Sequence, residues 1–439
     1  MNLIEPILFG IITIAAISMA TISARKIIRN IKLGKDLPIH GDALQRWKNV
    51  FLLAFGQQKM FRKPGVAILH LFVYVGFVII NIEIIEIILD GLTGHHRLFA
   101  PFLGSAYPFL INSFETLAVL VLIACVFFLA RRTITPVKRL KSTELKGWPQ
   151  NDALLILVTE IILMSLFLLM NSTDTLLQLR LVAPYSSHPT GPFLFSSLLH
   201  PLFENTSSST LILIERSTWW MHIVGIYGFL NYLPTSKHLH ILLAFPNAYY
   251  KPLDAMGKME NMPAIQQEVL YAMQPELAPS TQADVPARFG AKDVQDLSWK
   301  NLLDAYSCTE CGRCSSACPA NQTGKKLSPR KIMMDTRDRL EQVGRLVDKN
   351  GEWKEDGRSL LHDYISIEEI NACTTCNACV QECPVSISPL DIILQLRRNL
   401  VMEESNTPAE WASLFGNVEN NFAPWKFSPS DRENWTHSS

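Results

Sequence analysis

Eight cysteines in the C-terminal half of the chain have the spacing of iron–sulfur ligands. They form two runs of Cys-x2-Cys-x2-Cys-x3-Cys-Pro, which are Cys308, Cys311, Cys314 and Cys318, then Cys373, Cys376, Cys379 and Cys383. In bacterial-type proteins with two [4Fe–4S] clusters, three closely spaced cysteines bind one cluster and the fourth binds the other. The pattern therefore predicts two clusters with crossed ligands. The first set is Cys308, Cys311, Cys314 and Cys383. The second set is Cys373, Cys376, Cys379 and Cys318.

Structural zinc is the alternative occupant, because it also binds four thiolates. Zinc sites usually have paired Cys-x2-Cys units, whereas each run here has three evenly spaced cysteines and a fourth before proline, which favours iron–sulfur clusters. The ninth cysteine, Cys125, lies in the apolar run VLIACVFFLA and is interpreted as a small packing residue.

Helices are expected on both sides of each cysteine run. Ser298 precedes WKNLLDAY as an N-cap, and Ser366 with Glu369 forms the pattern of a capping box. Ser-Pro pairs at residues 328–329 and 388–389 begin the helices that follow the two runs, with proline at the first helical position. The C-terminal half is therefore expected to be a duplicated helical domain rather than a compact β-rich ferredoxin.

The N-terminal half is depleted in charge. Only 33 of the first 250 residues are charged, against 47 of the remaining 189, and the formal net charge of the whole chain is zero. This excludes a single water-soluble domain, a disordered chain and a general nucleic-acid binder, which would carry a basic excess. Length alone allows two to three domains.

Five apolar stretches are long enough to cross a bilayer, which takes about 20 helical residues. They are residues 3–23, 66–89, 109–130, 153–170 and 217–245. Lysine and arginine are concentrated in the loops after the first and third stretches, and the other two loops have few. The positive-inside rule then places the N-terminus outside and the cysteine-rich half in the cytoplasm. A reducing cytoplasm makes metal binding by the cysteines more favourable than disulfides.

Ionisable residues within membrane spans are candidates for function, because their burial in lipid is costly. The candidates are His70, Glu83, Glu86, Glu115, Glu160, His222, His238 and His240. For a single carboxylate, or for His238, a packing role is the simpler interpretation.

Two of these histidines, His222 and His240, are 18 residues apart, which is five turns or about 27 Å along one face of a continuous helix. His70, near the cytoplasmic start of its span, lies at the level of His240, so the two imidazoles are predicted to bind one haem b iron. His222 is the candidate ligand of an outer haem. Ile80 stands where its partner is needed, and the outer-loop residues His95, His96 and His200 are the alternatives.

The first half resembles the membrane gamma subunit of respiratory nitrate reductases, a five-span b-type cytochrome. The resemblance depends on ILHLFVYVGF at residues 68–77 and on WWMHIVGIYGFLNYLPTSKHLHIL at residues 219–242. It implies two b haems and quinol chemistry. On this pattern His70 and His240 match the inner pair, and His222 matches one ligand of the outer pair.

The second half resembles the helical two-cluster ferredoxin domain of heterodisulfide reductases, anaerobic glycerol-3-phosphate dehydrogenases and succinate dehydrogenase iron–sulfur subunits. The resemblance implies electron relay between membrane quinone or haem and a catalytic site, which in such families often lies on a domain with a Cys-Cys-Gly motif. This sequence has no adjacent cysteines and no G-x-G-x-x-G or Walker motif, so nothing indicates a flavin or nucleotide site.

The expected fold is all-α, with a five-span bundle at residues 1–245, a linker at 246–297, the ferredoxin domain at 298–403 and a tail at 404–439. A cluster of basic residues is expected to form a solvated helix face, with anionic lipid or an acidic partner as alternatives. Its members are Lys325, Lys326, Arg330, Lys331, Arg337 and Arg339.

These features predict a membrane-bound electron-transfer subunit of a quinone-linked oxidoreductase in a bacterial or archaeal cytoplasmic membrane. The expected cofactors are two [4Fe–4S] clusters and at least one haem b. The expected partners are lipid, quinone and a cytoplasmic redox subunit, with or without a Cys-Cys-Gly domain, and no nucleic acid. The alternatives are a haem-free anchored ferredoxin and a zinc-binding membrane sensor. The terminal donor or acceptor does not follow from the sequence.

Overall fold

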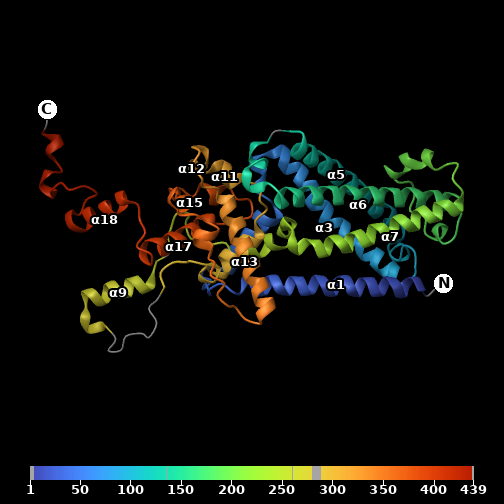
Figure 1. Ribbon diagram of the computed structural model, residues 1–439. Coiled ribbons are helices and arrows are strands. Elements are labelled where there is room, and N and C mark those ends of the chain that lie inside the picture. The colour runs from blue at the N-terminus through green and yellow to red at the C-terminus, as the bar shows by residue number, and fades with distance from the viewer. Residues whose placement is uncertain (1–3, 136, 260, 279–287, 438–439) are drawn as a thin grey trace.

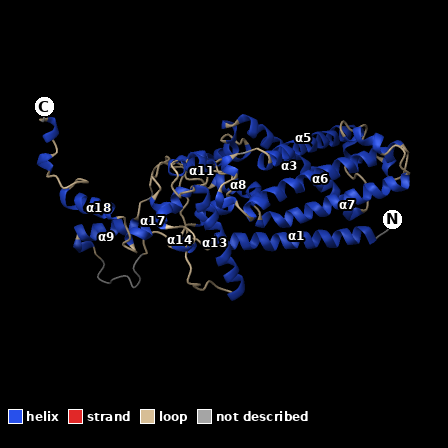
Figure 2. Ribbon diagram, turned by 45° about the horizontal axis from the view of Figure 1, so that its top comes forward, coloured by secondary structure: helices blue, strands red, loops and turns tan. Residues whose placement is uncertain are grey.

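The computed structural model describes residues 4–135, 137–259, 261–278 and 288–437, and within them it is built from helices. The β-structure of these residues consists of two isolated bridges (Figure 2). The predicted all-α fold is therefore confirmed. Residue 3 of the first predicted span, residues 260 and 279–287 of the linker, and residues 438–439 of the tail lie outside the described residues.

Long helices lie side by side in a bundle, and the shorter helices of the cysteine-rich half gather at one end of it (Figure 1). In the described part, four helical segments are long and apolar enough to cross a membrane. They are α1 (Ile4–Ile31), α3 (Pro64–Thr93), Ala100–Thr133, which contains α4 (Ala100–Leu103) and α5 (Tyr107–Thr133), and α6 (Trp148–Leu179). They coincide with the first four predicted spans.

The fifth long helix, α7 (Ser208–Tyr232), packs against α6 and α1. Its 25 residues are about 37 Å long, enough to cross a bilayer core. Polar residues in its first half, including the neighbouring Glu215 and Arg216, lower its hydropathy, and it is not among the four segments that length and composition identify.

The prediction of one continuous helix over residues 217–245 is wrong. Helix α7 ends at Tyr232, two 3-10 turns follow at Leu233–Thr235 and Lys237–Leu239, and α8 runs from His240 to Tyr249. The backbone at Ser236 is extended, which interrupts the helix. Asp152 near the start of α6 stabilises the break by accepting hydrogen bonds from the Ser236 hydroxyl (2.8 Å) and the Lys237 N–H (3.0 Å). His222 and His240 therefore do not share one helix face.

The cysteine-rich half contains short helices around two longer ones. In chain order these are α10 (Trp299–Ser307), α11 (Arg313–Ala317), α12 (Pro319–Gln322), α13 (Pro329–Asn350), α14 (Leu360–Asp363), α15 (Ile367–Asn371), α16 (Ala378–Glu382) and α17 (Pro389–Met402). The predicted caps are confirmed, with capping boxes at Ser298 and Ser366 and side-chain N-caps at Ser328 and Ser388.

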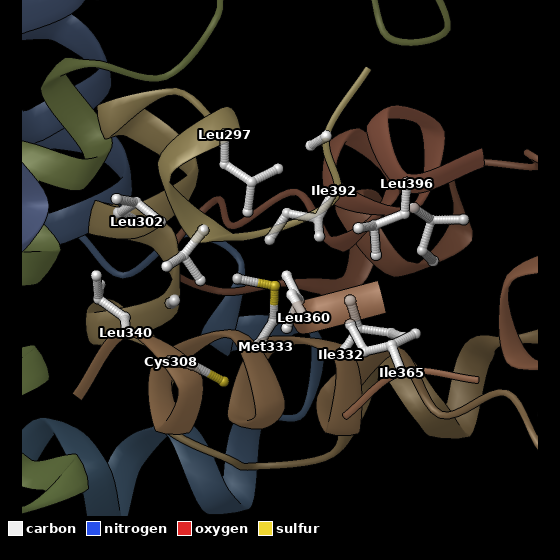
Figure 3. Close-up of a cluster of buried hydrophobic side chains, with 14 of the residues drawn as sticks. Leu297, Leu302, Cys308, Ile332, Met333, Leu340, Leu360, Ile365, Ile392 and Leu396 are labelled. Atoms are coloured by element: carbon white, nitrogen blue, oxygen red, sulfur yellow. The ribbon is translucent and has the colours of Figure 1, made fainter. Parts of the chain in front are cut away.

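The core of this half brings α10, α13 and α17 together. Figure 3 shows Leu302, Ile332, Met333, Ile392 and Leu396 in this core, with Cys308 at its edge. The core also contains three fully buried residues from the end of the predicted linker, which are Ala291, Val294 and Leu297.

The cysteine-rich half is packed directly onto the bundle. Ile27 at the end of α1 and Leu239 before α8 belong to its apolar core. Lys35, just after α1, pairs through its backbone with the segment that begins α10, since its N–H donates to Leu297 O (2.7 Å) and its carbonyl accepts from the Trp299 N–H (3.0 Å). This end of the bundle also bears the basic loops between α1 and α3 and between α5 and α6, which contact α16 and α13.

The remaining helices connect or extend these two parts. They are α2 (Ala43–Asn49), a π-helical segment at Val50–Phe55, α9 (Pro263–Met273) and α18 (Ala409–Asn421). Helices α9 and α18 lie on the side of the cysteine-rich half away from the bundle (Figure 1).

Candidate metal centres

The first predicted ligand set surrounds one pocket. Its lining includes the thiol-bearing residues Cys308, Cys311, Cys314 and Cys383, together with Gly312. The pocket has about 350 Å³ of empty space, part of it open to solvent. Cys308 is the C-cap of α10, Cys311 lies in the loop that follows, and Cys314 lies in α11. Cys383 directly follows α16. The fold thus brings the last cysteine of the second run to the first three of the first run.

The members of the second predicted ligand set are near one another. Cys318 lies close enough to Cys373 and Cys379 for electrostatic interaction of their thiolates, as does Cys376. Cys376 is exposed and Cys379 is buried. Helices α11 and α16 contact each other, so the two groups of four cysteines are neighbours within the domain.

Burial favours the neutral thiol at several of these positions. It raises the pKa of Cys308 and Cys379 to about 12 and that of Cys383 to about 11, with neighbouring cysteines adding to the effect. Thiolates are the form that binds metal, so cluster binding here must displace protons. A four-sulfur donor set in a buried pocket fits an iron–sulfur cluster by its chemistry.

Backbone carbonyls next to the ligands are held by cations. Lys59, in the loop before α3, donates to Cys383 O (3.0 Å), and burial lowers the pKa of its ammonium group. Arg397 of α17 donates to Cys373 O (2.8 Å), and Arg313 donates to Lys59 O (3.0 Å). These contacts fix the cysteine loops against α17 and against the bundle.

His70 and His240 are brought together from different helices. Their ring centroids are 6.5 Å apart. His70 Nδ1 is 3.0 Å from Gln57 Oε1, and His240 Nδ1 is 3.0 Å from Lys237 O. Neither Nε2 atom has a hydrogen-bond partner among the described residues. Two imidazoles on one iron, each about 2 Å from the metal and about 1 Å more to the ring centre, would have centroids roughly 6 Å apart. The separation of the two rings would therefore allow both residues to hold one metal ion, and each Nδ1 has the hydrogen-bond partner that is usual for metal-ligating histidines.

Other histidines occupy different surroundings. His222 is buried, with Nδ1 3.0 Å from Leu163 O and its ring 5.8 Å from that of Phe167. Among the described residues, no histidine makes a ring contact with His222. His96 lies 3.4 Å from Asp174 Oδ1 at the end of the bundle away from the cysteines. The outer haem stays a prediction.

Two of the buried carboxylates singled out by sequence have structural partners. Glu86 accepts from the Tyr107 hydroxyl (2.9 Å) and the Phe99 N–H (2.8 Å). Glu115 accepts from the N–H groups of Phe195 and Ser196. These bonds tie the loops at the end of the bundle away from the cysteines to α3 and α5. Arg97 and Asp174 form a buried ion pair nearby at 2.5 Å. The sequence did not indicate this pair, because Arg97 lies in a loop outside the predicted spans.

The expected solvated face at the basic cluster is wrong for its central members. Arg330 is 1% exposed and pairs with Glu144 (2.6 Å) in the loop after α5, and Arg339 is fully buried against Asp293 and Asp356. Arg337 contacts Glu310 at 2.8 Å. Each arginine faces inward because a carboxylate from another element is there to pair with it. Lys326 is exposed, as expected for the remainder.

Arg330→Met is expected to weaken the attachment of the cysteine-rich half to the bundle. It removes the cationic partner of the partly buried Glu144, which keeps only the Ser328 hydroxyl (2.8 Å) as a side-chain donor, and the loss costs about 1–3 kcal/mol. Limited proteolysis across a denaturant series measures this loss. The matched variant Lys326→Met, which breaks the exposed pair with Glu368, should leave the midpoint unchanged. Equal midpoints for Arg330→Met and the parent protein would contradict the role of the Arg330–Glu144 pair in attaching the cysteine-rich half to the bundle.

Comparison with known proteins identifies a domain that spans both cysteine runs. Residues 307–387 match the 4Fe-4S dicluster domain family. Over 97 residues (22% of this chain and 46% of the relative), the chain is 32% identical to one subunit of the ferredoxin:CoB-CoM heterodisulfide reductase of Methanosarcina mazei. The heterodisulfide reductase resemblance of the C-terminal half is therefore confirmed. No solved structure matches the chain.

Two longer relatives are similar over most of this chain. The probable iron-sulfur-binding oxidoreductase FadF of Bacillus subtilis is 28% identical across 98% of the chain, and the EtfAB:quinone oxidoreductase of Syntrophomonas wolfei is 26% identical across 89%. The chain spans 60% and 54% of their lengths, respectively. Together with the apolar helices, these findings describe a 4Fe-4S dicluster domain joined to membrane helices, the organisation of a membrane iron–sulfur electron-transfer protein.

Proposed function

We propose that this chain links the quinone pool to a cytoplasmic redox partner by way of an inner haem b and two [4Fe–4S] clusters. The observation that carries the proposal is the arrangement of candidate ligands. His70 and His240 form a pair at the end of the bundle, and the cysteine sets lie directly against that end. Quinone enters from the printed name of the Syntrophomonas wolfei relative and from the membrane location.

The contacts favour an order for the ligand sets. Gln57, which holds His70, is two residues from Lys59, which binds the backbone of Cys383. The set with Cys308 is therefore the one next to the histidines. The set with Cys373 includes the exposed Cys376, which favours it as the set that faces a partner.

In this proposal the chain's own residues hold and orient the redox groups. His70 and His240 would hold the haem iron through Nε2, and the two sets of four thiolates would hold the clusters. When bound, these groups supply one-electron chemistry, and the protein determines their positions and surroundings. The positive-inside pattern supports a cytoplasmic location for the clusters, because the basic loops are at the same end of the bundle.

The purified protein tests this assignment directly. We expect about eight iron and eight sulfide per chain, and a b-type band in the reduced-minus-oxidised spectrum that develops on addition of a quinol. Iron and sulfide without a b-type band would instead identify the chain as a haem-free anchored ferredoxin. Ile80 favours the absence of haem at the outer position, because it stands where a ligand is needed. Zinc without sulfide would contradict both.

A further inference from the structure

We infer that Lys237 is a positioning residue that joins the segment holding His240 to the loop of the first cysteine set. The inference rests on the proposed function, because it concerns the ligand sets assigned there. It adds a residue that the cysteine and histidine patterns did not indicate.

Lys237 reaches in two directions from the break between α7 and α8. Its backbone carbonyl is 3.0 Å from His240 Nδ1, so it accepts the hydrogen bond that orients that imidazole. Its ammonium group forms an ion pair with Glu310 and donates to Pro149 O (2.6 Å) at the start of α6. One residue therefore contacts the candidate haem ligand, the membrane bundle and the cysteine loop.

Glu310 is the part of the cysteine loop that Lys237 contacts. It lies between Cys308 and Cys311, is 4% exposed, and has a positive φ of 53°, a conformation that side chains other than glycine adopt at a cost. Its other carboxylate oxygen is 2.8 Å from Arg337 of α13. The Glu310 side chain thus holds a strained loop in place, but only while its two cationic partners remain.

The Lys237 side chain is suited to this role by its burial and its stem. It is 8% exposed, and its backbone N–H is itself anchored by Asp152 at 3.0 Å. A compact ammonium with three donors can bind Glu310 and Pro149 O at once, whereas an apolar side chain leaves Glu310 with one cation. Loss of this contact is expected to let the cysteine loop shift relative to His240.

Displacements of about 1 Å are enough to matter between redox groups or reacting groups that must be held at fixed separation. Lys237→Met should therefore retain iron, sulfide and haem but weaken the magnetic interaction between haem and cluster in EPR spectra. It should also slow haem reduction by pre-reduced clusters, because the electron-transfer rate falls as the separation of the two groups grows. Lys237→Arg, which keeps the charge, should restore most of the haem–cluster magnetic interaction and most of the rate of haem reduction.

The control is Lys331→Met. Lys331 pairs with Asp335 at 2.6 Å and with Glu369 at 3.0 Å, and among the described residues its ion pairs and hydrogen bonds reach neither Glu310 nor the His240 segment. It should leave the haem–cluster interaction unchanged. If Lys237→Met fails to retain its cofactors, Glu310→Gln provides the same test, because it removes the charge and keeps the size of the side chain.

The two levels of the argument fail separately. Parent protein without a b-type band contradicts the proposed haem function before any variant is compared. Parent protein with haem, and a Lys237→Met or Glu310→Gln variant whose EPR interaction and reduction rate equal the parent's, overturns the role of Lys237 alone. A double variant that is no slower than either single variant supports one shared contact.

Discussion

Cys318→Ala is expected to remove the cluster of Cys373, Cys376 and Cys379, although Cys318 belongs to the other run of the sequence. A [4Fe–4S] cluster needs four ligands, and Cys318 lies beside Cys373 and Cys379 in the fold. Iron and sulfide should fall from about eight to about four per chain. EPR of the reduced protein should lose one signal and the magnetic coupling between clusters.

Cys383→Ala provides the reciprocal experiment, because Cys383 lines the pocket with Cys308, Cys311 and Cys314. Cys383→Ala should remove the EPR signal of the cluster held by Cys308, Cys311 and Cys314. It should leave the signal of the cluster held by Cys373, Cys376 and Cys379. Cys125→Ala, which replaces a buried packing residue of α5, should leave both signals intact. Cys308→Ala and Cys373→Ala identify which signal belongs to which run, and if Cys318→Ala removes the signal that Cys308→Ala removes, ligation follows the sequence runs and the crossed assignment is wrong.

His240→Ala is expected to abolish the inner haem. Its Nε2 has no hydrogen-bond partner in the part of the chain that the structure describes, its ring lies 6.5 Å from that of His70, and alanine offers no ligand to replace it. The b-type band should disappear from the reduced-minus-oxidised spectrum, and haem extracted per chain should fall to about the level of non-specific binding. His70→Ala should have the same effect.

His238 supplies a matched control two residues away. Its ring lies 5.7 Å from that of His240 and 5.3 Å from that of Phe229, so His238→Ala perturbs the same segment without removing either proposed ligand. It should retain the haem. Retention of the full b-type band in His240→Ala, or its loss in His238→Ala alone, would assign the iron ligand differently. Iron and sulfide measured in the same samples separate loss of haem from loss of folding.

The sequence correctly indicated the features that depend on local spacing. Apolar runs of about 20 residues identified the four helical segments that are long and apolar enough to cross a membrane in the described part of the chain. Ser-Pro pairs and capping boxes located the starts of α10, α13, α15 and α17. Such signals are readable because a helix needs a cap within its first turn and a span needs a fixed apolar length.

The same reasoning failed where an element ends through a distant contact. The periodic spacing of His222 and His240 predicted one helix, but Asp152, some 80 residues earlier in the chain, stabilises a break before His240. The arginines of the basic cluster on α13 were wrongly predicted to face solvent, because distant contacts decide this feature too. Their burial depends on Glu144, Asp293 and Glu310, which come from three other segments.

The chemistry of this protein was therefore determined largely by sequence. The helix starts around the cysteine runs follow from residue type and spacing, and the same spacing predicts the cysteine ligands and proposes His70 and His240, because ligand sets and helix starts are encoded locally. What only the tertiary structure decided is how these groups are joined. The contacts of Lys59 with Cys383, Gln57 with His70 and Lys237 with Glu310 bring together residues that no local pattern pairs, because complementary charge and buried hydrogen bonds form only once the chain has folded.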